Sequence, residues 1–341
     1  MRVGIAGFGY MGRMHYGCWK KVAGAEVVAL CDKDKRQFET PEAADGNAIG
    51  ADASCDYGNA VIFEDFGRML EEAKLEVVDI TLPTFLHVSM ACQALAKGIH
   101  VLCEKPMALT AAECDTMLAA WKAAPAGTEL MIGQCLRFRN EYVYAKSLIE
   151  SGAYGKVIAA SFGRYSAAPG WTRDGGKSWF FDESRSGGVA LDLHIHDTDM
   201  VQFLFGLPQS VTSSAYHDND GVMIHISTLY NVGGAAVTAE GGWGMAKSFG
   251  FERGFQIVFE RATLVMASNR TPEFCLYPME GKPFTPELPA SDPYQNEINW
   301  FTDKIRGGSV ESVTSPEESR DSVRIVDAEK ASAKSGKAVY L

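Results

Sequence analysis

The densest group of potentially reactive side chains lies between Ser186 and Asp199, in the stretch SGGVALDLHIHDTD. Asp192, His196 and Asp199 are spaced by four and three residues, so a helix would place them on one face and His194 on another. Histidine is the side chain whose proton equilibrium lies nearest neutral pH, and an aspartate one turn earlier can orient it. The spacing therefore predicts a general acid and base site at Asp192 and His196.

Two alternatives stay open for this stretch. A metal site could use His194, His196 and a carboxylate, although residues two apart on a helix do not converge on one point. A structural pair of histidine and aspartate is the other alternative, because buried polar residues are normally partnered.

A second reactive group follows two expected strands. Val77–Leu82 is a largely apolar run that we expect to be a strand, and the loop after it extends to His87. The next run, His100–Cys103, is followed directly by Glu104, Lys105 and Pro106. Ligands gather at the carboxyl edge of open α/β sheets, so we expect Lys105 at a ligand site, with a solvated surface lysine as the alternative. The peptide bond before Pro106 can be cis where a tight turn is needed.

The first twelve residues, MRVGIAGFGYMG, carry the spacing G-x-G-x-x-G at Gly7, Gly9 and Gly12, between an expected strand and an expected helix. Gly7 permits a tight turn, Gly9 lets the backbone approach a pyrophosphate, and Gly12 lets the helix pack close to the strand. Backbone N–H groups at the helix start then face the phosphates. The pattern predicts dinucleotide binding, and a plain structural turn is the alternative.

Asp32 strengthens this interpretation, because it lies at the end of the second expected strand, where a carboxylate can bind the ribose hydroxyls of the adenosine. A carboxylate there also repels a 2′-phosphate, which favours NAD over NADP. The neighbouring cations Lys33 and Arg36 keep NADP open.

The elements that must position these groups change in pattern near residue 133. Up to that point strands alternate with helices, which predicts a doubly wound parallel sheet of the α/β class. The expected strands are Val3–Ala6, Glu26–Cys31, Val61–Phe63, Val77–Leu82, His100–Cys103 and Glu129–Gly133, and the expected helices are Arg13–Val22, Asp65–Glu72, Phe85–Lys97 and Ala111–Ala123. The polar stretch from Lys33 to Asn59 is interpreted as a short helix and a loop.

Beyond residue 133 a helix at Glu141–Ser151 is followed by strands with few helices between them, which predicts a mainly antiparallel sheet in an α+β domain. The expected strands are Val157–Arg164, Val211–Tyr216, Val222–Tyr230, Ala235–Gly242 and Phe255–Phe259, and the late helices are Gln295–Arg306 and Pro316–Lys334. We therefore predict two domains, 1–133 for the dinucleotide and 134–341 for substrate binding and oligomerisation. Neither face of Val222–Tyr230 is purely polar, so we expect a second subunit to cover one of them, in a homodimer or homotetramer.

Composition narrows the function further. The chain has 341 residues and a formal charge of −11, which argues against nucleic acid as a partner. Its eight cysteines are scattered without zinc-like spacing, which is typical of free thiols in a reducing compartment. The sequence shows no signal peptide and no long apolar segment, so we expect a cytoplasmic protein with no membrane contact.

Taken together, these motifs resemble those of the Gfo/Idh/MocA oxidoreductases, the glucose-fructose oxidoreductase and inositol dehydrogenase family. The resemblance rests on the glycine motif with His15, Thr81-x-Pro83-x-x-x-His87, Glu104-Lys105-Pro106, and Gly187-Gly188 before Asp192-x-x-x-His196-x-x-Asp199. It implies an N-terminal Rossmann domain, a C-terminal domain with a large open sheet, and hydride transfer between a nicotinamide cofactor and a sugar, cyclitol or related polyol. Departures at Arg139-Asn140 and at His194 leave the substrate open.

The resemblance also implies residue roles. The expected catalytic residues are Lys105, Asp192 and His196, and no metal is expected. The expected cofactor contacts are Gly7, Gly9, Tyr10, Met11, Gly12, Asp32, Thr81, Pro83, His87, Glu104 and Lys105. The expected substrate contacts are Lys105, Arg137, Trp171, Trp179, Asp192 and His196, although the tryptophans could simply be packed.

Oxidation of a secondary alcohol needs a base near the hydroxyl and a cation that stabilises alkoxide character. We hypothesise that His196, oriented by Asp192, takes the proton while Lys105 hydrogen-bonds the same oxygen, and the reverse assignment stays open. Two other classes also stay open: an NAD-dependent glycoside hydrolase that oxidises its substrate only transiently, and a non-catalytic cofactor-sensing protein.

Overall fold

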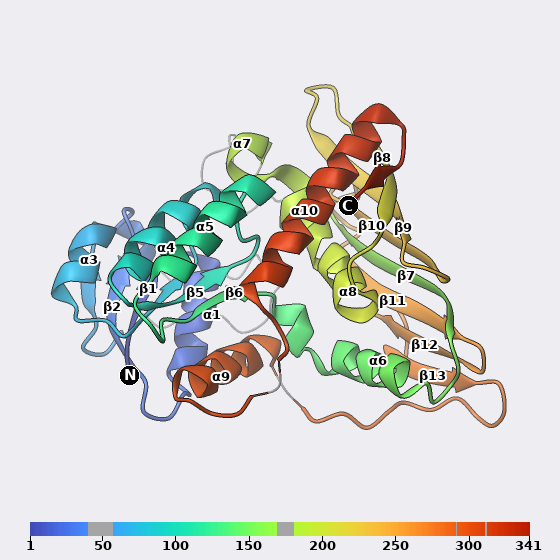
Figure 1. Cartoon of the computed structure of the whole chain (residues 1–341), viewed down its shortest axis with the longest axis horizontal. Helices are drawn as coiled ribbons and strands as arrows, with labels where there is room; N and C mark the ends of the chain where they lie inside the picture. Colours follow the sequence, from blue (N-terminus) through green and yellow to red (C-terminus); the bar gives the residue numbers. More distant parts are fainter. Residues whose placement is uncertain (40–56, 169–180, 291, 311) are drawn as a thin grey trace. The chain divides into compact units, whose positions relative to one another are not determined.

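The computed structural model describes residues 1–39, 57–168, 181–290, 292–310 and 312–341 (Figure 1). These residues form two compact units, Met1–Cys135 with Asp292–Arg320 and Leu136–Ser291 with Asp321–Leu341. The division differs from a single boundary after residue 133, because the segment Asp292–Arg320 returns to the first unit. Its helix α9 (Pro293–Ile305) packs there against α1 (Tyr10–Trp19).

The first unit contains a six-stranded parallel sheet in the order β3-β2-β1-β4-β5-β6, as the alternation of strands and helices predicts. Its central strands are buried along most of their length, because helices cover both faces of such a sheet. The strands are β1 (Arg2–Ala6), β2 (Glu26–Cys31), β3 (Val61–Phe63), β4 (Val77–Ile80), β5 (His100–Glu104) and β6 (Leu130–Gly133).

Helices α4 (His87–Ala96) and α5 (Ala111–Ala123) cover one face of this sheet, and α1 and α9 lie on the other (Figure 1). Side chains cap several helix starts: Asp65 precedes α3 (Phe66–Glu72), Thr110 precedes α5 and Asp292 precedes α9. The short helix expected after Asp32 is α2 (Arg36–Glu39), and the rest of the expected loop lies largely outside the described residues.

The second unit is built on an eight-stranded sheet in the order β13-β12-β11-β7-β10-β9-β8-β14. Only the pairing of β10 with β7 is parallel, which confirms the mainly antiparallel prediction. The strands are β7 (Val157–Ser166), β8 (Ser210–His217), β9 (Met223–Asn231), β10 (Ala236–Gly242), β11 (Phe251–Phe259), β12 (Ala262–Ala267), β13 (Phe274–Pro278) and β14 (Val339–Tyr340). The last three were not predicted.

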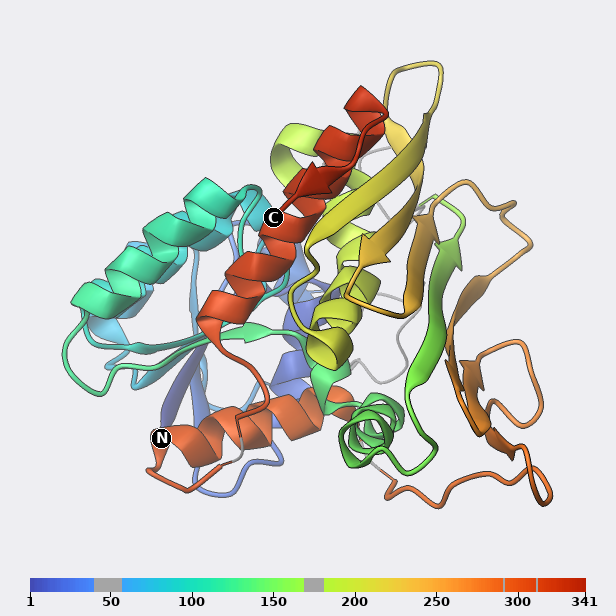
Figure 2. The same cartoon turned by 45° about the vertical axis from the view of Figure 1, so that its right-hand side comes forward.

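Helices α6 (Asn140–Ser151), α8 (Ile195–Phe205) and the part of α10 (Pro316–Ser335) beyond Arg320 cover one face of this sheet (Figure 2). In β9 the side chains of Ile226, Thr228 and Tyr230 are buried on that face. The opposite face exposes Leu229 and Tyr216. No helix of the described ranges is both long and apolar enough to cross a membrane.

Candidate functional site

The three glycines of the first loop have different surroundings. Gly7 has a φ of +91°, and a Cβ there would lie 2.7 Å from the carbonyl oxygen of Thr81. A Cβ on Gly12 would overlap the carbonyl oxygen of Gly7. A Cβ on Gly9 would meet no atom of the described residues within 4 Å. Gly7 and Gly12 therefore serve internal packing, whereas Gly9 borders open space at the start of α1.

This open side suits a pyrophosphate. No side chain among the described residues caps the start of α1, whose first internal hydrogen bond runs from the Arg13 N–H to the Gly9 carbonyl at 3.1 Å. The first N–H groups of a helix have no partner within the helix, and the helix dipole makes them attractive to anions. The residues present therefore fit the phosphates of a dinucleotide.

Asp32 lies half-buried at the end of β2 and is tied to this loop. Its Oδ2 accepts the Phe8 N–H at 2.8 Å, and its Oδ1 accepts the Asp34 N–H at 2.9 Å. Each carboxylate oxygen can accept a second hydrogen bond, so a ribose hydroxyl can still be bound. Arg36 is held by Asp34 through two bonds of 2.7 and 2.8 Å.

Two side chains, Thr81 and His87, make hydrogen bonds that hold the loops after β4 and β5. The Thr81 hydroxyl donates to the Gly7 carbonyl at 2.6 Å. His87 is 1% exposed, with Nδ1 2.8 Å from the Pro106 carbonyl and Nε2 2.7 Å from the Leu82 carbonyl. Burial lowers the pKa of His87, so the ring is neutral at pH 7 and donates to one carbonyl at a time. His87 thus joins the two loops, and its direct contact with a cofactor stays a prediction.

Lys105 follows β5 directly and is half-buried, and the peptide bond between Lys105 and Pro106 is cis. The Lys105 N–H donates to Glu104 Oε2 at 3.1 Å. Glu104 itself is 6% exposed, with its Oε1 3.0 Å from Nε2 of His15 in the interior of the first unit. The carboxylate of Glu104 is therefore engaged inside the unit, and its contact with a cofactor stays a prediction.

In the second unit, the helix that carries Asp192 and His196 begins irregularly. Gly187 and Gly188 both have a φ in the left-handed region, at +77° and +68°. Residues Ala190–His194 then form a π-helical turn before α8 begins. Between Ala190 and Leu204, only Asp192 and His196 are partly exposed, and every other side chain is buried. Asp192 and His196 are thus the two side chains of this segment that solvent or a ligand can reach.

Asp199 does not share the exposure of that pair. Its carboxylate is 1% exposed and is bound by Nε and Nη2 of Arg137, both at 2.9 Å, and by the Ser322 hydroxyl at 2.7 Å. Asp199, which the spacing groups with Asp192 and His196, is thus engaged by Arg137 and Ser322. Arg137 is fully buried in this ion pair, and its contact with a substrate stays a prediction.

His194 is 0% exposed. Its Nε2 lies 3.3 Å from Glu329 Oε2 on α10 and 3.3 Å from the Tyr230 hydroxyl. Burial lowers the pKa of His194, but the charge and hydrogen bond of Glu329 outweigh it, so the pKa is raised above the ordinary value. Among the described residues, the ligand atoms that lie close enough together to hold a metal ion do not include those of His194 and His196. Sequence reasoning missed Glu329, because 135 residues separate it from His194.

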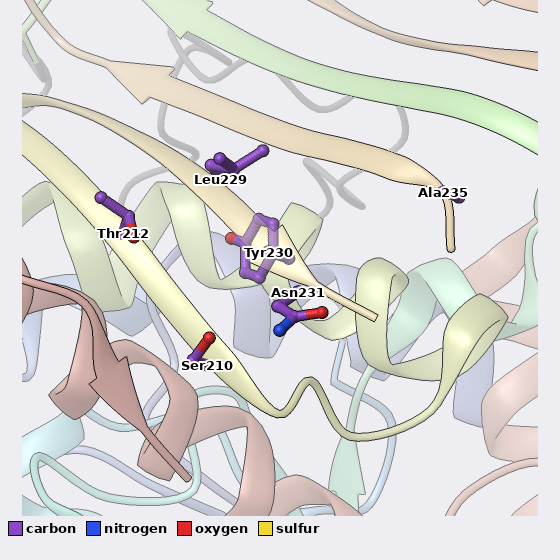
Figure 3. Close-up of a pocket in the computed structure, with 6 residues that line it drawn as sticks. All are labelled: Ser210, Thr212, Leu229, Tyr230, Asn231 and Ala235. Atoms are coloured by element: carbon purple, nitrogen blue, oxygen red, sulfur yellow. The ribbon is translucent and has the colours of Figure 1, made fainter. Parts of the chain in front are cut away.

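Two remaining features are not part of this geometry. Trp171 and Trp179 lie outside the described residues, so their contacts with a substrate stay predictions. A pocket of about 260 Å³ lies at one end of β8 and β9, lined by Ser210, Thr212, Leu229, Tyr230, Asn231 and Ala235 (Figure 3). Its one titratable group, the Tyr230 hydroxyl, already donates to Glu329 at 2.6 Å. This pocket therefore carries no group for proton transfer.

The strand order of the first sheet, the glycine loop before α1 and the acid after β2 define a dinucleotide-binding Rossmann domain, here followed by an open and mainly antiparallel sheet. Residues 1–131 match the family model "Oxidoreductase family, NAD-binding Rossmann fold", and residues 142–265 match "GFO/IDH/MocA C-terminal domain". The chain belongs to the Gfo/Idh/MocA family of oxidoreductases, and its first unit contains the NAD-binding domain.

Individual relatives support the same conclusion. A 2,7-anhydro-N-acetylneuraminate hydratase from Mediterraneibacter gnavus is 33% identical over 210 residues, 61% of this chain and 50% of that protein. A D-apiose dehydrogenase from Paraburkholderia graminis is 30% identical over 202 residues, 59% of this chain and 49% of that protein. The chain thus spans about half the length of the curated relatives it matches. A solved structure of levoglucosan dehydrogenase with NADH and levoglucosan shares the fold, with a TM-score of 0.82 over 100% of this chain and 99% of that chain, at 21% identity.

Proposed function

We propose that the protein is an NAD(P)-dependent oxidoreductase that transfers a hydride between nicotinamide and a secondary alcohol of a sugar, cyclitol or related polyol. The observation that carries this proposal is the partial exposure of Asp192 and His196 on an otherwise buried helical segment. A purely structural pair would be expected to be buried like its neighbours. Relatives named D-apiose dehydrogenase and levoglucosan dehydrogenase support the class of substrate.

In this proposal one residue accepts the proton and another stabilises the negative charge on the substrate oxygen. A bound nicotinamide ring supplies or accepts the hydride. His196 takes the proton from the substrate hydroxyl, Asp192 orients the imidazole, and the Lys105 ammonium hydrogen-bonds the same oxygen and stabilises its developing negative charge. The opposite assignment, with Lys105 as the proton acceptor, needs the same groups in the same place.

Asp32 favours NAD over NADP in the proposed reaction. Both of its oxygens are fixed by backbone N–H groups, so a 2′-phosphate would meet a held negative charge. The nearby cation Arg36 is already bound by Asp34. We therefore propose that kcat/KM is higher with NAD than with NADP.

The proposal also covers the oligomeric state and the location of the enzyme. We propose a homodimer or homotetramer in which a second copy covers the exposed face of the eight-stranded sheet, which carries Leu229 and Tyr216. Seven cysteines in the described part of the chain are free, in keeping with a cytoplasmic location.

One relative favours a second candidate. The Mediterraneibacter gnavus protein is named a hydratase, and hydration is a reaction without net oxidation. A reaction in which oxidation is only transient, such as glycoside hydrolysis, would use the same pair of residues. A panel of polyols, sugars and anhydrosugars, followed at the nicotinamide absorbance with NAD and NADP and by product analysis, separates the two. Net NADH formation supports the dehydrogenase, whereas product formation without absorbance change supports the second candidate.

A further inference from the structure

Four ionisable side chains from four elements meet in the interior of the first unit. His15 comes from α1, Asp79 from β4, Glu104 from β5 and Glu297 from α9. His15, Asp79 and Glu297 are 0% exposed and Glu104 is 6% exposed. Burying three carboxylates around one imidazole is costly unless a positive charge or bound protons compensate them.

Asp79 fixes the orientation of the imidazole. Its Oδ2 lies 2.9 Å from His15 Nδ1 and also accepts the Trp19 indole N–H at 2.7 Å. His15 therefore presents its other nitrogen, Nε2, to Glu104 and Glu297. A carboxylate that holds one imidazole nitrogen while the other faces a cation is the usual support of a metal-binding histidine.

The atoms on the other side of the ring lie close together but do not meet hydrogen-bond geometry. His15 Nε2, a Glu104 oxygen and a Glu297 oxygen all lie within 4.8 Å of one another. His15 Nε2 and Glu104 Oε1 are 3.0 Å apart but are not aligned for a hydrogen bond. Neither Glu297 oxygen has a hydrogen-bond partner among the described residues, although the side chain is fully buried. Native proteins rarely leave a buried carboxylate in this state.

Two kinds of occupant could satisfy these atoms, a proton or a cation. Burial raises the pKa of Glu297 well above its ordinary value, and the charge of Glu104 raises it further. Burial lowers the pKa of His15, but Asp79 and Glu104 outweigh it and raise that pKa well above its ordinary value, so protons on His15 and Glu297 are the occupancy that competes with a cation. A divalent cation would accept one ligand atom from each of the three.

We propose that His15, Glu104 and Glu297 bind a divalent transition cation, with Asp79 as the residue that orients His15. Imidazole and carboxylate ligands together suit Zn²⁺ and Mn²⁺. Ligand atoms about 2.1 Å from such an ion lie roughly 3 Å apart, which agrees with the separation of His15 Nε2 from Glu104 Oε1.

The proposed cation would have a structural role. Glu297 lies on α9, in the segment that returns to the first unit, so the ion would fasten this segment to α1 and β5. The second oxygen of Glu104 accepts the Lys105 N–H, so the ion would also hold the residue that precedes Lys105. This role does not depend on the substrate or on the direction of the reaction.

The test uses the full chain, treated with a chelator, dialysed, and then titrated with Zn²⁺ or Mn²⁺. We expect about one bound ion per chain by elemental analysis, a changed Mn²⁺ electron paramagnetic resonance spectrum, and a thermal midpoint several degrees higher with metal. Glu297→Gln should abolish all three effects, and Asp79→Asn should weaken binding about 10- to 100-fold. The control Glu71→Gln, on the surface of the same unit, should behave like the wild type.

Three results would overturn the proposal. One is a wild-type chain that binds neither ion and melts at the same temperature with and without metal. Another is metal binding that persists unchanged in Glu297→Gln. The third is a wild type that binds no ion and is less stable than Glu297→Gln. That result would show that Glu297 holds a proton instead of a cation. If Glu297→Gln does not fold, the Mn²⁺ titration of the wild type decides alone.

Discussion

Asp197, the residue that follows His196, is bound by Arg164 through both carboxylate oxygens, at 3.1 and 3.2 Å. Both side chains are buried, at 4% and 0% exposure. Two residues further along α8, Asp199 is bound by Arg137 in the same two-pronged way. The backbone beside His196 is therefore anchored to β7 and to the start of the second unit, which fixes the imidazole more firmly than a surface loop could.

Asp197→Asn should weaken the fold strongly. The substitution leaves the Arg164 guanidinium buried without its counter-charge, and such a loss costs about 3–5 kcal/mol. Asp192→Asn is the matched comparison, because Asp192 is half-buried and its removal should change stability by less than about 1 kcal/mol. Urea unfolding followed by circular dichroism at pH 7 measures both. Equal free energies of unfolding for the two variants would show that the ion pair between Arg164 and Asp197 does not stabilise the fold in this way.

The contact between His194 and Glu329 should make stability depend on pH. The pKa of His194 is raised in the folded chain, so its contribution is complete below the unfolded value of about 6.5 and is lost as pH rises through the folded pKa. Glu329→Gln removes the charge that raises this pKa. We expect the wild type to lose more stability than Glu329→Gln between pH 5.5 and 8.5, measured by urea unfolding. Parallel curves for the two proteins would contradict this assignment.

Gly9→Ala and Gly12→Ala should fail in different ways. A Cβ on Gly9 meets no atom within 4 Å in the part of the chain that the structure describes, so Gly9→Ala should fold normally and yet bind NAD at least about tenfold more weakly. A Cβ on Gly12 overlaps the Gly7 carbonyl, so Gly12→Ala should lower the melting temperature as well. Thermal melts and NAD titration by fluorescence distinguish these effects. Wild-type NAD affinity in Gly9→Ala would place the pyrophosphate elsewhere.

His87→Ala should loosen the loops that carry Pro83 and Lys105. Loss of the side chain removes the donor from whichever carbonyl group, that of Leu82 or that of Pro106, it serves, at a cost of about 1–3 kcal/mol. We expect both the thermal midpoint and NAD affinity to fall. His100→Ala, at the opposite end of β5, should lower the midpoint but leave NAD affinity unchanged. Unchanged NAD affinity in His87→Ala would show that the loops keep their shape without this contact.

Much of the fold follows from local patterns in the chain. The ranges Glu26–Cys31, Val61–Phe63 and Ala111–Ala123 have the bounds expected from their sequences, because each is a clear run between turn or capping residues. The glycine loop and Asp32 were also predicted to lie together, because a strand, a turn and a second strand fix their distance.

What the sequence does not reveal depends on contacts between distant segments. The return of α9 to the first unit, and with it the meeting of Glu297 with His15, joins residues 282 positions apart. Asp199 has the spacing of one helical face with His196, but Arg137, which lies 62 residues earlier in the chain, binds its carboxylate. Glu104 was predicted as a cofactor contact, and nothing in its local sequence indicates that its Oε1 lies 3.0 Å from Nε2 of His15, 89 residues earlier in the chain.

The central claim is that Lys105 acts on the same hydroxyl as His196. It is tested most directly by the steady-state turnover of Lys105→Met with a polyol that the wild type oxidises, alongside the Kd of NAD for both proteins. The account predicts that Lys105→Met loses turnover by at least about a thousandfold, while its Kd for NAD stays within about threefold of the wild type. Turnover close to that of the wild type, with the same substrate and NAD, would contradict it.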